Sequence, residues 1–137
     1  MDDLEFQCDH CYAMFVAPLF GINQTREQLT KDARGDVFID ITWGEGVANF
    51  CSAACRDAGR QKVMDSHGVP IPEDPPGIES DEKCAVCSGP VDVTAPHITF
   101  AEEEIDLTAE APTPENFEYL ALVCPTCEAR IKIGRVF

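Results

Sequence analysis

Positively charged residues are scarce in this chain of 137 residues, where four lysines and six arginines stand against 25 acidic side chains. The formal net charge is therefore −15. A surface of this sign repels nucleic-acid phosphates and anionic membranes, which disfavours binding to either. An acidic, lysine-poor composition is also typical of proteins from salt-loving microbes, because concentrated salt shortens the Debye length to about 3 Å and weakens self-repulsion. We favour this halophilic interpretation over an ordinary acidic surface.

Long apolar runs are also missing, and none approaches the roughly 18 residues of a membrane span. The acidic residues 1–5 lack the basic and apolar regions of a secretory signal. We therefore expect a cytoplasmic protein without a membrane segment, in a compartment where thiols stay reduced. The sequence contains no H-E-x-x-H motif, no Gly-rich phosphate loop and no recognisable Ser/His/Asp set, so we do not expect an enzyme.

The chain is rich in cysteine, and its eight cysteines fall into four close pairs with none left over. Paired cysteines in a reducing compartment are more often metal ligands than disulfides. Zinc accepts four thiolates in a tetrahedron, so two pairs complete one closed structural site. The sequence therefore predicts two zinc ions with four cysteines each. The predicted ligands are Cys8, Cys11, Cys51, Cys55, Cys84, Cys87, Cys124 and Cys127.

The sequence leaves alternatives open for these pairs. The pairs share ions either sequentially or in a cross-braced manner, and the Pro-rich segment between the second and third pairs favours sequential sharing. Iron–sulfur clusters also take four thiolates, so iron remains an alternative to zinc. A redox role of the C-x-x-C type is disfavoured, because that motif works as a single pair on an α/β fold.

The first cysteine set frames a predicted knuckle, hairpin and helix. Residues 23–35 are polar, and residues 25–28 fit a weak capping box, which predicts a short exposed helix. Residues 36–42 alternate as a half-buried strand, residues 43–46 predict a turn with two glycines, and residues 47–50 return as a second strand. A helix is expected after the second cysteine pair. This order of elements is that of the treble-clef zinc fold.

The second half repeats the theme after residues 66–82, which contain four prolines and predict a semi-rigid linker. Strand pieces are expected at residues 91–93 and 96–100. Residues 101–116 carry six acidic side chains and two prolines, which predicts an acidic loop. Residues 117–123 then return as a strand into the fourth cysteine pair. The tail beyond it fits either a helix, as in a second treble clef, or a strand, as in a zinc ribbon.

These segments predict a small α+β protein that is stabilised by zinc and built from two treble-clef or zinc-ribbon-like units. We expect a treble-clef-like finger over residues 1–65, the linker over residues 66–82 and a second finger over residues 83–137. A unit of about 60 residues buries little surface, so metal would supply what its core cannot. The spacing between the second and third ligands is similar in the two sets, at 39 and 36 residues.

Two family resemblances accompany these motifs. Residues 8–62 resemble a treble-clef finger of the TRASH/MYM type, which pairs C-x-x-C with an aromatic-preceded C-x-x-x-C, here F-C-S-A-A-C at residues 50–55. Residues 84–135 resemble the small C-P-x-C zinc-finger proteins of halophilic archaea through C-P-T-C at residues 124–127. Both resemblances imply binding modules, and some TRASH-type domains are associated with metal sensing.

Most of the few basic residues follow the second and fourth cysteine pairs. One interpretation is a small basic face that binds an anionic partner. The other, which we favour, is charge compensation, since a zinc ion with four thiolates carries a formal charge of about −2. The residues concerned are Arg56, Arg60, Lys62, Arg130, Lys132 and Arg135.

The three histidines show no catalytic or ligand spacing. His10 lies inside the first knuckle, where four thiolates already suffice, so we expect it beside the ligands or in solvent. His67 falls in or beside the linker and His97 in a strand piece.

The function expected from these features is that of a non-catalytic zinc-binding adaptor or regulator that contacts another protein. One alternative is a nucleic-acid-binding regulator that uses the basic clusters. A second alternative is a metal sensor or trafficking protein whose first site exchanges its ion.

Overall fold

The computed structural model describes residues 5–16, 18–78, 81–106, 110 and 115–135. Within these residues the protein is a small, strand-rich α+β structure with one main antiparallel sheet of four strands. In this part of the chain, no helix combines the length and the apolar character needed to cross a membrane.

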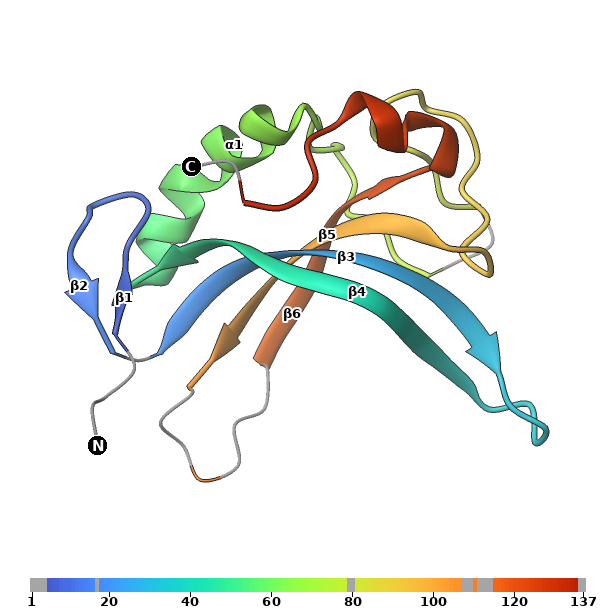
Figure 1. The fold of residues 1–137 in the computed structure, drawn as a ribbon, viewed down its shortest axis with the longest axis horizontal. Coiled ribbons are helices and arrows are strands. Elements are labelled where there is room, and N and C mark those ends of the chain that lie inside the picture. The colour runs from blue at the N-terminus through green and yellow to red at the C-terminus, as the bar shows by residue number, and fades with distance from the viewer. Residues whose placement is uncertain (1–4, 17, 79–80, 107–109, 111–114, 136–137) are drawn as a thin grey trace.

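Two hairpins build the main sheet (Figure 1). The first joins β3 (Leu19–Lys31) to β4 (Val37–Phe50), and the second joins β5 (His97–Ile105) to β6 (Glu115–Val123). The first strands of the two hairpins pair with each other, which gives the strand order β4-β3-β5-β6. Residues 66–82 therefore connect two halves of the chain that share one sheet.

Helix α1 (Ala53–His67) and the short 3-10 helix η1 (Pro125–Arg130) lie on the same side of this sheet, above it in Figure 1. Ser52 caps α1, because its hydroxyl accepts a hydrogen bond from the backbone N–H of Cys55 at 3.1 Å. Gly68 ends the helix in the left-handed conformation, with φ of 79°. The helix predicted after the second cysteine pair is thus present and extends to residue 67.

Two predictions for the first half are wrong. Residues 25–28 belong to strand β3 and form no helix, because β3 pairs with a neighbour on each side and this pairing outweighs a weak local capping signal. Residues 43–46 form no turn, since β4 continues through them as one strand of 14 residues. Its register with β3 shifts beside Asn23 and again beside Glu27. These irregularities accommodate extra residues without ending the strand.

The predicted acidic loop also needs correction. Residues 101–105 continue β5 and residues 115–116 begin β6, while residues 107–109 and 111–114 lie outside the described residues. Glu102 is only 4% exposed. An acidic side chain is compatible with a buried strand position when basic side chains bind it, and sequence alone did not show that such partners were near.

After η1, residues 131–135 run beside α1 and β3 and are neither helix nor strand, and residues 91–93 are likewise not in a strand. The backbone N–H of Lys132 donates to the carbonyl of His67 at 2.9 Å. The side chain of Gln24 donates to the carbonyl of Lys132 at 3.0 Å and accepts from the N–H of Gly134 at 2.7 Å. His67 itself is fully buried, with Nε2 lying 2.8 Å from the carbonyl oxygen of Gly134.

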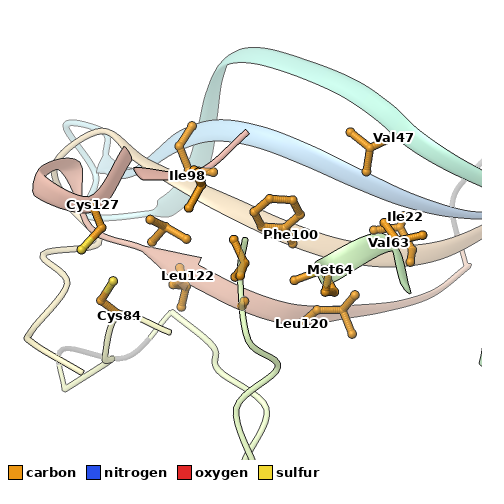
Figure 2. Packing of buried hydrophobic residues seen from close by; sticks show 14 of the residues in the cluster. Ile22, Val47, Val63, Met64, Cys84, Ile98, Phe100, Leu120, Leu122 and Cys127 are labelled. Atoms are coloured by element: carbon orange, nitrogen blue, oxygen red, sulfur yellow. The ribbon is translucent and has the colours of Figure 1, made fainter. Parts of the chain in front are cut away.

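The apolar core fills the space between the sheet and α1. Phe100 of β5 and Ile22 of β3 are fully buried there, together with Met64 of α1. Figure 2 shows the same cluster reaching Cys84 and Cys127 at one end. The second cysteine set is therefore part of the core.

Gly59 allows α1 to pack closely against the end of β4. A Cβ atom at this position would lie 2.6 Å from Cε1 of Phe50, whose ring is fully buried. We predict that Gly59→Ala lowers the free energy of unfolding by about 1–3 kcal/mol through overpacking, although alanine is the better helix former by about 1 kcal/mol. Denaturant titration of the metal-loaded protein measures the change.

The control for this prediction is Ala58→Gly, on the exposed side of the same helical turn. It should lose about 0.5–1 kcal/mol from helix propensity alone. A Gly59→Ala protein that is as stable as the original would contradict the close approach of helix and strand.

Candidate metal centres

The first cysteine set closes around the start of α1. The turn between β1 (Phe6–Gln7) and β2 (Met14–Phe15) carries two of the sulfurs, and the residues after β4 carry the other two. The turn is fixed to the end of β4, since the N–H of Asp9 donates to the carbonyl of Asn49 at 2.8 Å and the carboxylate of Asp9 accepts from the N–H of Asn49 at 2.7 Å. The four residues are Cys8, Cys11, Cys51 and Cys55.

The second set closes around η1, at the other end of the sheet from β1 and β2 (Figure 1). Two of its sulfurs come from a turn that precedes β5, and two come from the segment that follows β6. The N–H of Ala85 donates to the carbonyl of Leu122 at 2.8 Å, which fixes this turn to the end of β6. The four residues are Cys84, Cys87, Cys124 and Cys127.

The two turns share one backbone scheme. In each, the N–H of the first cysteine donates to the carbonyl five residues later, at 2.9 Å in the first turn and 2.8 Å in the second. The residue four positions after the first cysteine donates back to that cysteine's carbonyl at 2.9 Å in both. This residue has a positive φ, 64° at Tyr12 and 62° at Ser88. The two halves thus share a plan at their metal centres, although their side chains differ.

The sulfur spacing fits a tetrahedral metal ion. The Sγ–Sγ distances are 3.6 Å from Cys11 to Cys51, 3.8 Å from Cys51 to Cys55 and 3.7 Å from Cys87 to Cys124. A tetrahedron with metal–sulfur bonds of about 2.3 Å has edges of about 3.8 Å. A disulfide would need sulfurs about 2.05 Å apart, and all eight cysteines are free. Each set can therefore hold a metal ion.

The eight predicted ligands are brought together in sequential sets, the first two pairs in one and the last two in the other. Cross-bracing is not observed among the described residues. The donor chemistry fits zinc, and the same four thiolates also suit iron.

Backbone N–H groups point at the first sulfur of each set. The N–H of Cys11 donates to Sγ of Cys8 at 3.5 Å, and those of Val86 and Cys124 donate to Sγ of Cys84 at 3.4 and 3.3 Å. Burial opposes ionisation of these two thiols, but the backbone hydrogen bonds outweigh it and lower the pKa of Cys8 to about 6 and of Cys84 to about 7. One thiol in each set therefore ionises more readily than an ordinary cysteine, before any metal binds.

Other thiols in the sets are harder to ionise. Burial, followed by hydrogen bonding to neighbouring thiols such as Cys11, raises the pKa of Cys51 to about 12. Burial and the thiol of Cys124 raise the pKa of Cys127 to about 12 in the same way. Without metal, these two thiols keep their protons near neutral pH. A metal ion must displace the protons, because thiolates are the ligand form.

We predict that zinc affinity rises with pH. Lowering the pH favours the protonated thiols, whose protons zinc must displace. Each proton released per ion therefore weakens zinc binding about tenfold for each unit by which the pH falls. Competition against a chromophoric chelator between about pH 6 and about pH 8 measures the effect. An affinity that does not change over this interval would show that the thiols are already ionised before metal binds.

Half of the residues in the two basic clusters bind carboxylates within the protein. Arg60 donates from Nε and from Nη2 to the two oxygens of Glu102, each at 2.9 Å, and Arg56 Nε lies 3.4 Å from the same carboxylate. Arg135 binds Asp9 at 2.6 Å. These three positive charges thus have carboxylate partners, whereas the sequence interpretation paired them with the metal sites.

The other three residues of the clusters, Lys62, Arg130 and Lys132, are exposed. His10 is also exposed and lies outside the four-cysteine set, in line with its expected place beside the ligands or in solvent. His97 is buried, and its Nδ1 lies 2.8 Å from the carbonyl oxygen of Ala95.

We predict that Glu102→Gln lowers the free energy of unfolding by about 2 kcal/mol, because the variant loses charge-assisted hydrogen bonds from Arg60. Denaturant titration at fixed zinc concentration measures it. Asp40→Asn on the exposed part of β4 changes the net charge by the same amount and should shift stability by less than about 0.5 kcal/mol. Equal effects of the two substitutions would refute a specific role for the buried carboxylate.

Comparisons with known proteins found no similarity: no family model, no curated protein and no solved structure matches this chain. The resemblances to TRASH/MYM fingers and to C-P-x-C proteins of halophilic archaea therefore rest on the cysteine motifs alone. The first site does follow the order knuckle, hairpin and helix, but no match to a known fold supports the treble-clef class. The protein is thus small and strand-rich, with two four-cysteine clusters that can bind metal.

Proposed function

We propose that the protein is a non-catalytic zinc-binding adaptor in which each four-cysteine set holds one structural zinc ion. The observation that supports this proposal is the closure of each set, since all four sulfurs lie within 4.8 Å of one another. Four thiolates complete a tetrahedral zinc and leave no position for water or substrate. Such an ion stabilises the fold and performs no reaction.

The position of each set supports a structural role. Both sets join three pieces of chain: a turn, the end of a strand in the main sheet, and the first turn of a helix. A structural zinc contributes about 10–16 kcal/mol of apparent binding energy, which is comparable to the whole stability of a small domain. We propose that the two ions hold the ends of the sheet in place.

A protein partner is the class of partner that the surface supports best. With a net charge of −15, the chain repels phosphate backbones. The alternative of nucleic-acid binding through the basic clusters has less support, because Arg56, Arg60 and Arg135 bind Glu102 and Asp9. The acidic, lysine-poor composition and the free thiols further support a protein of the cytoplasm in a salt-loving cell.

Metal exchange at the first site is a second candidate function, favoured by a difference in burial. In the first set Cys8 alone is buried, whereas Cys51 and Cys55 are half-buried and Cys11 is exposed. In the second set three of the four cysteines are buried. An ion in the first site is thus closer to solvent and to competing ligands, as a sensor or carrier would need.

We predict that native mass spectrometry of the full chain finds two zinc ions, and that a chelator removes the first-site ion faster. Cys11→Ser assigns the ions, because it weakens the first site and leaves the second intact. Complete removal should unfold the protein, as read by circular dichroism. Absence of metal, or a native fold after both ions are lost, would overturn the structural role. Equal loss rates would overturn the exchange candidate.

Cobalt substitution tests the closure of the sites. Cobalt bound by four thiolates has no free position, so added azide should leave its visible absorption spectrum unchanged. A spectrum that shifts with azide would reveal an open coordination position and would contradict a purely structural role.

A further inference from the structure

The face of the main sheet opposite α1 contains a groove of about 440 Å³. Side chains alternate along β3, so Ile22 and Gln24 are buried on the covered face while Asn23, Thr25 and Glu27 point to the other. The groove is therefore separate from the core and from both cysteine sets, and its residues come from all four strands of the sheet.

The walls of the groove are apolar and open to solvent. Ile39 and Ile41 of β4 form one wall, with Ile41 56% exposed, and Phe117 of β6, 48% exposed, forms another. The ring of Phe117 meets that of Tyr119 edge to face, with centroids 5.0 Å apart. Exposed apolar side chains gathered around a groove are typical of a binding surface.

The carboxylate of Glu27 lies among the groove residues and is only 5% exposed. Its partners are hydroxyl groups: Thr25 and Thr99 donate to Oε1 at 2.7 and 2.9 Å, and Tyr119 donates to Oε2 at 2.8 Å. Burial, then the hydrogen bond to Glu27 and its charge, raises the pKa of Tyr119, so that hydroxyl keeps its proton. The site is thus built around a carboxylate.

A positive charge is missing from this arrangement. No residue that lines the groove is basic, and none of the ion pairs among the described residues involves Glu27. His97, opposite Glu27 on β5, directs its Nδ1 to the carbonyl of Ala95. A second carboxylate, Glu103, also lines the groove. Hydroxyl donors satisfy the hydrogen-bonding capacity of a buried carboxylate in part, but they leave its negative charge without a counter-charge.

Charge and shape together select the occupant. A second copy of the chain would bring a surface with 25 acidic and only 10 basic side chains, which complements the carboxylates of the groove poorly. A metal ion would need several convergent ligands, and among the described residues only the two cysteine sets bring together three or more such side chains. A basic side chain with apolar neighbours matches both the carboxylates and the walls.

We propose that this groove binds a segment of another protein in which a lysine or arginine is flanked by apolar residues. The cationic group meets Glu27, and the flanking residues pack on Ile39, Ile41 and Phe117. The aromatic pair beside the carboxylate adds cation–π attraction. This inference rests on the proposed adaptor function and names the chemistry of its partner.

The test uses the full, zinc-loaded chain and a display library of random peptides. Enriched peptides should carry a basic residue between apolar ones. Fluorescence anisotropy of the enriched peptides should show affinity at least about tenfold weaker for Glu27→Gln, because the charge pair is lost. Ile41→Ser should weaken binding about threefold or more. Because the Ile41 side chain is exposed, this second variant tests the groove even where Glu27→Gln disturbs folding.

Asp40→Asn is the matched control, since it removes one negative charge from β4, the strand that pairs with the strand of Glu27, but Asp40 is not among the groove residues. It should change affinity less than about twofold. Equal weakening by Asp40→Asn and Glu27→Gln would mean attraction to the general negative charge and would overturn the proposal. So would enriched peptides without a basic residue, or no enrichment at all.

These outcomes are distinguishable from failure of the adaptor function. If peptides fail to bind while two zinc ions and the fold are intact, the groove proposal falls and the structural zinc sites remain. If a partner protein is identified whose affinity is the same for the original chain, Glu27→Gln and Ile41→Ser, the adaptor function stands and this groove is not its binding site. Loss of zinc without loss of fold defeats the structural-zinc proposal alone.

Discussion

The antiparallel pairing of β3 with β5 is the contact on which the rest of the structure depends. It runs from Leu19 opposite Ile105 to Glu27 opposite His97, and it joins the two hairpins into one sheet. Because these central strands run in opposite directions, the turn before β3 and the turn before β5 lie at opposite ends of the sheet. Each turn carries the first two cysteines of one set, so the two sets also lie at opposite ends of the sheet. A single ladder of backbone hydrogen bonds thus sets the separation of the two metal centres.

The metal sites supply what this sheet lacks. A hairpin leaves its two ends free, and each four-cysteine set ties the entry of one hairpin to its exit through the sulfurs that precede and follow it. The matching backbone bonds of the two turns show that this solution is used twice. The hairpins between them differ in size, with strands of 13 and 14 residues in the first and 9 and 9 in the second. The ligand geometry therefore constrains the ends of a hairpin and leaves its length free.

The sequence predicted the features that depend on local spacing. Cysteine pairs with two or three residues between them indicate metal binding, because a turn or the start of a helix can direct both sulfurs at one ion. The helix after Cys51 and the strand before Cys124 were likewise predictable from local pattern and are present. The separate strand proposed for residues 47–50 was not found, since these residues end one long strand.

Features that depend on distant partners were missed. Glu102 in a supposed acidic loop is buried because Arg60, 42 residues away, binds it. Glu27 was assigned to a short polar helix, yet its hydroxyl partners lie 72 and 92 residues away at Thr99 and Tyr119. The register shifts with which β4 continues as one strand through Gly44 and Gly46 also depend on its pairing with β3. No window of neighbouring residues contains this information, because strand register is decided between segments.

Buried acidic side chains have different partners on the two faces of the sheet, and this contrast bears on function. On the covered face, Glu102 is bound by Arg60, and Glu128 is bound by Arg26. On the open face, Glu27 is just as buried but has hydroxyl donors as its partners. A protein with 25 acidic and 10 basic residues has few cations for internal pairs, and the described ion pairs place them where helix, tail and sheet meet. The open face thus holds a buried carboxylate that takes part in none of the ion pairs among the described residues.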